Sequence, residues 1–363
     1  MAYEASTAEK DLDIINLDIL EKETAKAMEK GAYGYVQGGA GEEWTMRRNR
    51  EAFNDTVIVP RVLANLENPD LKTSVLGVDL PSPFIVSPSA AHGLCHIDGE
   101  KASAKAAAET GTIMSVSTYA NYAIEDIVRA GKAASAGFAW WFQIYMSKDD
   151  EFNNYLLDLA VEQGAKAIIL TADATVGGNR EADKVNGFTF PLPMANFDRF
   201  GSGKGQGIGE IYAKALQKIQ PSDVEKLAKR SKLPVIVKGI QAPEDALLSM
   251  GAGAAAVWIS NHGGRQLDGG PGSFDVLPSI AEAVAGRVPV IFDSGIRHAQ
   301  HAFKALASGA DVVGISRPLM YALCLGGSKG VVSLFRHLNK ELAMVMQLAG
   351  AKTIKDVKKA ILR

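Results

Sequence analysis

Residues 260–268 read SNHGGRQLD, which places a possible base and a cation on either side of two glycines. His262 can bind or release a proton near neutral pH, as a general base must. Arg265 carries a planar guanidinium that pairs with a carboxylate through two parallel hydrogen bonds. A single histidine is more often packed or solvated than catalytic. Here the glycines, which let the backbone approach a ligand, and the nearby cation favour a site.

Two further residues, from the segment LTADATVGGNR at 170–180, suit the same site. Asp173 could lie beside His262, raise its basicity and fix its tautomer. Arg180 could join Arg265 in holding a small carboxylate against the base. On its own, Arg180 could equally form a surface ion pair. Together the two arginines indicate a substrate that is a small carboxylic acid.

A second group of polar residues indicates a bound phosphate. Arg297, in FDSGIR, and Arg317, in ISRP, follow the last two of the predicted strands given below, where (β/α)₈ barrels often bind phosphate. The backbone N–H groups of residues 293–295 and 316–317 could line the same pocket. Because the two arginines above already account for a carboxylate, we assign the phosphate to a cofactor. Lys238, in VIVKGI, suits the support of negative charge on a reduced cofactor ring.

These residues lie at the ends of short apolar runs, and the segments between the runs show helical periodicity, as in 101–110 and 244–250. Continuous apolar runs suit the strands of a parallel sheet that helices cover. Eight such units favour closure into a (β/α)₈ TIM barrel, whose active site gathers at the carboxyl ends of the strands. The predicted strands are 84–90, 112–118, 140–145, 167–173, 234–240, 255–262, 289–296 and 311–318.

Two segments fall outside the eightfold pattern, although we expect residues 1–363 to form one domain. Residues 1–80 are predicted as a helical preamble, with an amphipathic helix over 17–30, a glycine-rich stretch to Gly41 and a helix around 42–53. Residues 174–222 form a long connection that we interpret as a mobile lid. Its alternate glycines between 201 and 209 do not form a nucleotide loop, because no strand precedes them directly and no Gly-Lys-Ser/Thr follows.

Composition narrows the function classes. A net charge of −2 and a pI near 6.3 give no basic field for nucleic acid, and no basic run suggests a membrane surface. No signal peptide is visible, and no apolar run reaches the roughly 18 residues of a membrane span. The two cysteines, Cys95 and Cys324, suit reduced thiols in a cytoplasmic protein. His92 and His96 lack acidic partners, so we predict no metal site.

These motifs together resemble those of the FMN-dependent α-hydroxy acid oxidase family, from about residue 12 to the end of the chain. SNHGGRQLD is the most specific of them, and it is supported by SPSAAHGL (87–94), WFQIYMSKDD (141–150), LTADATVGGNR (170–180), VIVKGI (235–240) and FDSGIR (292–297). The Ala-Ala-His-Gly run, Tyr119 and GAYGYVQGGAGEEWT (31–45) are most similar to the lactate-oxidising members. The resemblance implies an FMN enzyme that oxidises a small L-2-hydroxy acid with oxygen, most simply L-lactate to pyruvate and hydrogen peroxide.

The resemblance also implies roles for individual residues. His262 would remove a proton while hydride equivalents reach the flavin, with Asp173 as its partner. The substrate would contact Tyr35, Tyr119, Tyr145, Arg180, Tyr212 and Arg265, and Tyr145 would act at its oxygen. The flavin would contact Pro88, Ser89, Ala90, Ser117, Gln143, Thr171, Lys238 and Ser260. The phosphate would contact Asp293, Gly295, Arg297, Ser316 and Arg317. A homotetramer is implied as well.

One residue departs from the family pattern, and some alternatives stay open. Ser316 stands where the family usually has glycine. If glycine serves only close approach of the backbone, serine is tolerated because its N–H remains; if the position needs a positive φ, serine would cost about 1 kcal/mol and weaken FMN binding. Within the family, a dehydrogenase or a monooxygenase would share the same residues. In a different class, a flavin-free lyase could use Lys238 as a Schiff base. A barrel that binds its ligand without turnover is a third alternative.

Overall fold

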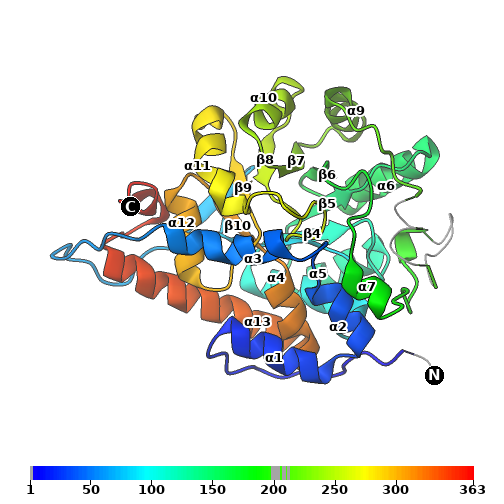
Figure 1. The fold of residues 1–363 in the computed structure, drawn as a ribbon, viewed down its shortest axis with the longest axis horizontal. Coiled ribbons are helices and arrows are strands. Elements are labelled where there is room, and N and C mark those ends of the chain that lie inside the picture. The colour runs from blue at the N-terminus through cyan, green and yellow to red at the C-terminus, as the bar shows by residue number, and fades with distance from the viewer. Residues whose placement is uncertain (1–2, 198–204, 207–209, 211–212) are drawn as a thin grey trace.

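Eight parallel strands close into a barrel in the computed structural model, which describes residues 3–197, 205–206, 210 and 213–363 (Figure 1). The order around the barrel is β10-β3-β4-β5-β6-β7-β8-β9, so each strand neighbours the next in sequence and the last meets the first. The strands are β3 (Phe84–Ser89), β4 (Met114–Ser117), β5 (Trp140–Ile144), β6 (Ile168–Thr171), β7 (Val235–Ile240), β8 (Ala256–Ile259), β9 (Val290–Phe292) and β10 (Val312–Ile315). The predicted TIM barrel is confirmed.

Alternation along the strands gives the barrel two apolar environments. One set of positions packs outward into the main core with the helices, while the other fills the barrel interior. The interior contains Trp141 and Trp258, whose rings meet edge to face at 6.4 Å between centroids. Further along seven of the eight strands the inward positions are polar: Ser87, Gln143, Thr171, Lys238, Ser260 and Asp293 lie two residues beyond an interior residue, and Ser117 lies four beyond Ile113. The barrel core therefore ends in a polar layer at its carboxyl end.

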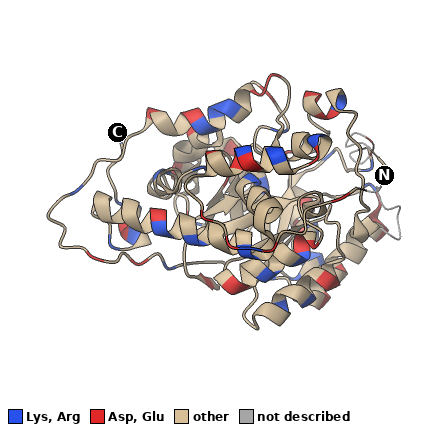
Figure 2. Ribbon diagram, turned by 90° about the horizontal axis from the view of Figure 1, so that it is seen from below, with Lys and Arg blue, Asp and Glu red and all other residues tan. Residues whose placement is uncertain are grey.

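Helices surround the barrel, as Figure 1 shows. They are α4 (Gly99–Thr110), α5 (Ile124–Ala134), α6 (Asp150–Gln163), α9 (Pro221–Ser231), α10 (Pro243–Gly251), α11 (Ser273–Val284), α12 (Ala299–Ala307) and α13 (Arg317–Ala349). Gly164 ends α6 with φ 87°, the left-handed conformation in which glycine is favoured. Figure 2 shows acidic and basic residues interspersed along the helices seen from that side.

The segment before the barrel is less purely helical than expected. It contains α1 (Leu17–Ala27), α2 (Lys30–Gln37), α3 (Trp44–Glu51), the 3₁₀ turn Ala52–Asp55 and a hairpin of β1 (Thr73–Val75) and β2 (Val78–Leu80). Helix α2 forms within the glycine-rich stretch, where no helix was assigned, because the Glu29 carboxylate accepts the N–H groups of Gly31 and Ala32 at 2.9 Å. Val75 and Leu80 of the hairpin pack with the barrel interior, so the hairpin contributes to its core.

Helix α13 is bent at Gly327, where φ is 60° and ψ is −144°. The N-terminal arm, residues 3–12, crosses this bend, and the Glu9 carboxylate accepts the N–H groups of Ser328 at 3.0 Å and Lys329 at 3.2 Å. By length and composition α13 could cross a membrane, but 89% of its most apolar stretch is buried inside the structure. It therefore packs as a core helix, against α1, α4 and α12.

The long connection after β6 rests on the barrel mouth where it is described. It contains α7 (Glu181–Val185) and the 3₁₀ turn Ala195–Phe197. Asn196 donates to the Thr118 carbonyl at 3.1 Å, and the Ala195 N–H donates to the Ala120 carbonyl at 3.1 Å. These bonds tie the connection to the loop after β4. Tyr212 lies outside the described residues.

Candidate active site

A cavity opens at the carboxyl end of the barrel and gathers most of the residues predicted from sequence. It is lined by Tyr35, Pro88, Ser89, Ala90, Tyr119, Tyr145, Arg180, Lys238, His262, Arg265, Asp293, Gly295, Arg297, Ser316 and Arg317. Ser117, Gln143, Thr171, Asp173 and Ser260 do not line it. Ser294, expected there through its backbone N–H, lines it as well. Ser87 also lines it and was not predicted, although the period-two alternation of β3 could have identified it.

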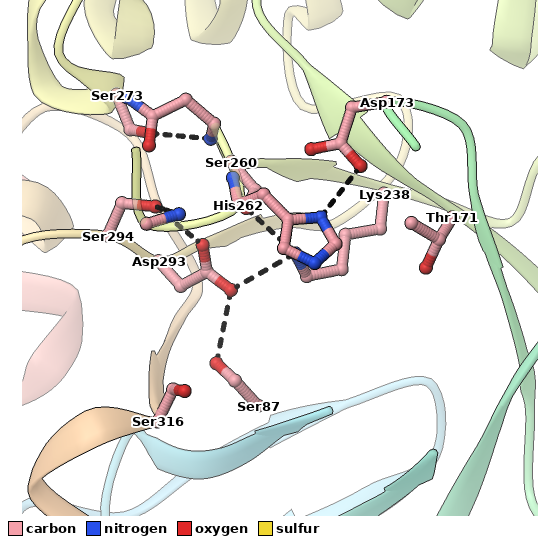
Figure 3. Close-up of polar contacts among 12 residues, drawn as sticks. Ser87, Thr171, Asp173, Lys238, Ser260, His262, Ser273, Asp293, Ser294 and Ser316 are labelled. Carbon is pink, nitrogen blue, oxygen red and sulfur yellow. Dashed lines mark hydrogen bonds and ion pairs between the residues drawn. The ribbon is translucent and has the colours of Figure 1, made fainter. Parts of the chain in front are cut away.

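His262 lies between a carboxylate and a phenol, and Figure 3 shows its contact with the carboxylate of Asp173. Its Nδ1 lies 3.0 Å from Asp173 Oδ1, and its Nε2 lies 3.2 Å from the Tyr145 hydroxyl. Asp173 follows β6 and His262 follows β8, so the barrel brings together residues that are 89 positions apart in sequence. Of the two ring nitrogens, the one beside Tyr145 is the one available to substrate.

Burial and charge set the protonation of this pair. Burial lowers the pKa of His262 below its ordinary value of 6.5, Asp173 partly offsets that change, and Lys238 and Arg180 add to it. For Asp173, burial alone would raise the pKa, but His262 and Lys238 hold it below its ordinary value. At neutral pH the pair is therefore a neutral imidazole beside a carboxylate, which is the state that a general base requires.

Lys238 is fixed beneath the base by the polar layer. Its Nζ donates to Ser260 Oγ at 2.8 Å and lies 3.5 Å from Asp293 Oδ2. The Asp293 carboxylate also accepts the Ser87 hydroxyl at 3.1 Å and the Ser294 hydroxyl at 3.0 Å. Because this carboxylate is engaged with Lys238 and two hydroxyls, Asp293 could face a phosphate through its backbone but not through its side chain.

The next polar positions form a chain of hydrogen bonds below the cavity. Ser117 donates to Gln143 Oε1 at 2.9 Å, and Gln143 Nε2 donates to Thr171 Oγ1 at 2.9 Å. All three side chains are buried. Their mutual bonds fix the Gln143 amide at the level where a planar cofactor would lie above the barrel.

Two guanidinium groups share one aromatic ring at the other side of the cavity. The guanidinium carbons of Arg180 and Arg265 lie 5.6 Å and 4.9 Å from the centroid of the Tyr35 ring. Arg265 also donates to the carbonyls of Tyr35 at 2.6 Å and Gly38 at 2.8 Å. Tyr119 stacks on Tyr145 at 4.6 Å between centroids, next to the base. This end of the cavity therefore combines two cations with aromatic walls, which suits a small carboxylate.

The opposite corner is strongly cationic. Burial, together with the nearby charges of Arg265 and Arg297, lowers the pKa of Arg317 to about 9. Arg317 is held by the carbonyls of Gly263 at 2.9 Å and Gly38 at 3.0 Å. Glu21 Oε2 lies 3.8 Å from Arg297 Nε, so one carboxylate faces the three arginines. The remaining positive charge suits a phosphate monoester such as that of FMN. The residues present thus fit the phosphate that the resemblance implies.

Ser316 does not need the conformation that favours glycine. Its φ is −121°, outside the left-handed region, and its hydroxyl lies 2.9 Å from that of Ser89. Of the two alternatives for this position, the one in which it needs a positive φ is therefore excluded. Among the described residues, no group of three or more His, Cys, Asp or Glu side chains is arranged to hold a metal ion.

Comparison with known proteins gives consistent matches along nearly the whole chain. The model of the family described as FMN-dependent dehydrogenase matches residues 24–363. The L-lactate oxidase of Lentilactobacillus hilgardii is 54% identical over 360 residues, covering 99% of this chain and 96% of that protein. The L-lactate oxidase of Streptococcus iniae is 47% identical over 362 residues, covering 99% and 89%.

Solved structures agree. A Pediococcus acidilactici protein described as a lactate oxidase superposes with a TM-score of 0.94 at 52% identity, covering 99% of this chain and 97% of that one. A mandelate oxidase superposes with a TM-score of 0.90 at 32% identity, covering 96% and 99%.

Proposed function

The chain belongs to the FMN-dependent dehydrogenase family, and on that premise we propose that it oxidises L-lactate with molecular oxygen to pyruvate and hydrogen peroxide. The observation that carries the proposal is a partly buried, neutral His262 whose Nε2 faces the same cavity as Arg180 and Arg265. The names of the relatives support it, since several are L-lactate oxidases. Lactate loses two electrons and two protons, and oxygen takes them up.

Each residue around the substrate has a distinct task in this proposal. Arg180 and Arg265 bind the carboxylate and so orient the reacting carbon toward the base. Tyr145 donates a hydrogen bond to the substrate oxygen. His262 takes up one substrate proton at Nε2, and the carboxylate of Asp173 stabilises the imidazolium that results.

The remaining polar residues would hold the cofactor. Arg297, Arg317 and the backbone N–H groups of Gly295 and Ser316 would bind the phosphate, while Lys238 would lie beside the flavin ring. FMN, when bound, supplies the two-electron acceptor that oxygen regenerates. A Schiff base at Lys238 is disfavoured because its Nζ donates to Ser260 Oγ at 2.8 Å and lies 3.5 Å from Asp293 Oδ2, so the amine is already engaged.

The test is turnover by the purified protein. We expect flavin absorbance, and pyruvate and hydrogen peroxide in equal amounts from L-lactate and oxygen. Rates with lactate, glycolate, 2-hydroxybutyrate and mandelate, with and without oxygen, define the substrate and the acceptor. A preference for mandelate would overturn the lactate assignment, and turnover only with another acceptor would indicate a dehydrogenase. A product other than pyruvate would indicate a monooxygenase. A colourless protein that takes up no FMN would refute the proposal altogether.

We further propose a cytoplasmic homotetramer in which residues 174–222 act as a lid. Two buried, free thiols, Cys95 and Cys324, suit a reducing compartment. The bonds that tie Asn196 and Ala195 to the barrel mouth support a covering role for the connection. The tetramer and the contact of Tyr212 with substrate rest on the family resemblance.

A further inference from the structure

The loop that carries His262 adopts a conformation that needs support from outside the loop. His262, Gly263 and Gly264 have φ values of 59°, 70° and 74°, so three consecutive residues lie in the left-handed region. Glycine tolerates this conformation, but histidine does so only where its surroundings impose it. The Asn261 side chain spans the turn, because its Oδ1 accepts the N–H of Gly264 at 3.1 Å. Whatever fixes the Asn261 amide therefore also fixes the backbone of the base.

Asn49, from helix α3 in the segment before the barrel, fixes this amide on both its oxygen and its nitrogen, and the Pro271 carbonyl accepts a further bond from the nitrogen at 3.0 Å. Asn49 Nδ2 donates to Asn261 Oδ1 at 2.8 Å, and Asn261 Nδ2 donates to Asn49 Oδ1 at 2.7 Å. The same Asn49 oxygen accepts the N–H of Ser273 at 3.0 Å. Asn49 is 2% exposed and Asn261 is 6% exposed, so water cannot replace these bonds.

The rest of α3 lies tightly against the same loop. A Cβ added to Gly264 would come within 2.6 Å of the Met46 backbone, so only glycine allows the contact. In return, the loop caps the helix, since Asp268 Oδ1 accepts the N–H of Thr45 at 2.8 Å. Helix and loop thus hold each other at two points, one on each side of His262.

We propose that Asn49 is a positioning residue that acts through Asn261 to hold His262 in line with Asp173 and Tyr145. This inference rests on the proposed function. Arg265 is anchored separately, by the carbonyls of Tyr35 and Gly38, so the binding of the substrate carboxylate does not depend on Asn49. Loss of Asn49 should therefore act on the chemical step more than on substrate binding.

The test compares Asn49→Ala, the milder Asn49→Ser, Asn261→Ala and the double variant with wild type. A displacement of the base on the order of 1 Å costs about 10²-fold in rate, so we expect kcat to fall about 10- to 100-fold while KM changes less than about threefold. The losses from Asn49→Ala and Asn261→Ala should not add in the double variant, because both break one pair. Hydrogen–deuterium exchange of residues 260–266 should quicken in each variant, with or without FMN.

Thr112→Val is the matched control. It removes a buried hydrogen bond, from Thr112 Oγ1 to the Phe84 carbonyl at 2.5 Å, at the opposite end of the barrel. We expect it to lower the melting temperature while leaving kcat and the exchange of residues 260–266 unchanged. The inference is overturned if both Asn49 variants melt lower but keep the wild-type kcat, or if the losses in the double variant add. If no variant and no wild-type protein oxidises lactate, the proposed function fails, whereas the exchange experiment still reports on the loop.

Discussion

Replacing Asp173 with asparagine isolates the charge beside the base. Asparagine has the same size and keeps an oxygen that can accept the N–H of His262 Nδ1, so the change removes the negative charge and little else. In the wild type this oxygen lies 3.0 Å from the imidazole. As His262 takes up a proton, an ion pair forms at this distance in a buried site, and in the variant it cannot form.

The size of the effect follows from that distance. Two unit charges 3 Å apart interact with about 5 kcal/mol at an effective dielectric constant of about 20. Burial of the carboxylate offsets much of this, and hydrogen bonds to charged groups contribute about 1.5–3 kcal/mol net. Because 1.36 kcal/mol corresponds to a tenfold change in rate, we predict that kcat/KM falls about 10- to 150-fold.

The direction in which Asp173→Asn moves the pH dependence of kcat/KM is a second test. Activity requires neutral His262, so kcat/KM rises with pH through the pKa of His262, which lies below 6.5 in the wild type. The Asp173 charge raises that pKa against the effect of burial, so Asp173→Asn should move the rising limb to lower pH. Steady-state rates across this range measure both quantities, with Asp158→Asn, in an exposed ion pair with Arg230, as the charge-matched control. An unchanged rate, or a limb displaced to higher pH, would refute this account of the base.

Three other perturbations test separate parts of the structure. Ser316→Gly should leave FMN binding unchanged or make it weaker. Glycine relieves no strain, because φ is already −121°, and it loses the contact with Ser89; a lower FMN dissociation constant in a fluorescence titration would contradict this. Glu9→Gln should lower the free energy of unfolding by about 0.5 kcal/mol, a small value because Glu9 is exposed. Burial alone would raise the pKa of Glu9, but hydrogen bonds from Ser328 and Lys329 lower it below 4.5. The difference in unfolding free energy between wild type and Glu9→Gln, measured by denaturant titration, should therefore vanish as pH falls through that pKa. Burial lowers the pKa of His301 from 6.5 to about 3, so this group destabilises the fold as pH falls from about 6.5 toward 3. The unfolding free energy of His301→Asn should lack this part of the pH dependence.

The strands could be predicted because both faces of each are buried. Outward and inward positions meet different apolar environments, so each run is hydrophobic throughout and stands out from its helical neighbours. Helix α2 could not be predicted, because Gly31 and Gly34 have low helix propensity and the helix depends on the Glu29 carboxylate at its start. The hairpin was missed because Leu76 occupies a left-handed turn position that sequence rarely assigns to leucine.

The site shows the same division. His262, Arg265 and Lys238 lie at strand ends of a recognisable barrel, so topology alone brings them to one mouth. The side-chain direction of Asp293 could not be predicted, because it depends on its ion pair with Lys238. The role that we propose for Asn49 could not be predicted either, because Asn49 lies on a segment outside the eightfold pattern and its partner is 212 positions away.

The N-terminal arm has a consequence for how the chain is made. Its contacts with α13 join residues more than 300 positions apart, as between the Leu12 N–H and Ser333 Oγ at 3.1 Å. The arm is synthesised before its partners in α13, so it cannot dock until the barrel between them has been synthesised. Until it docks, the second half of α13 begins without its cap. Docking of the arm therefore requires that α13 has been synthesised, and the susceptibility of the arm to a protease during translation would report whether synthesis has passed this helix.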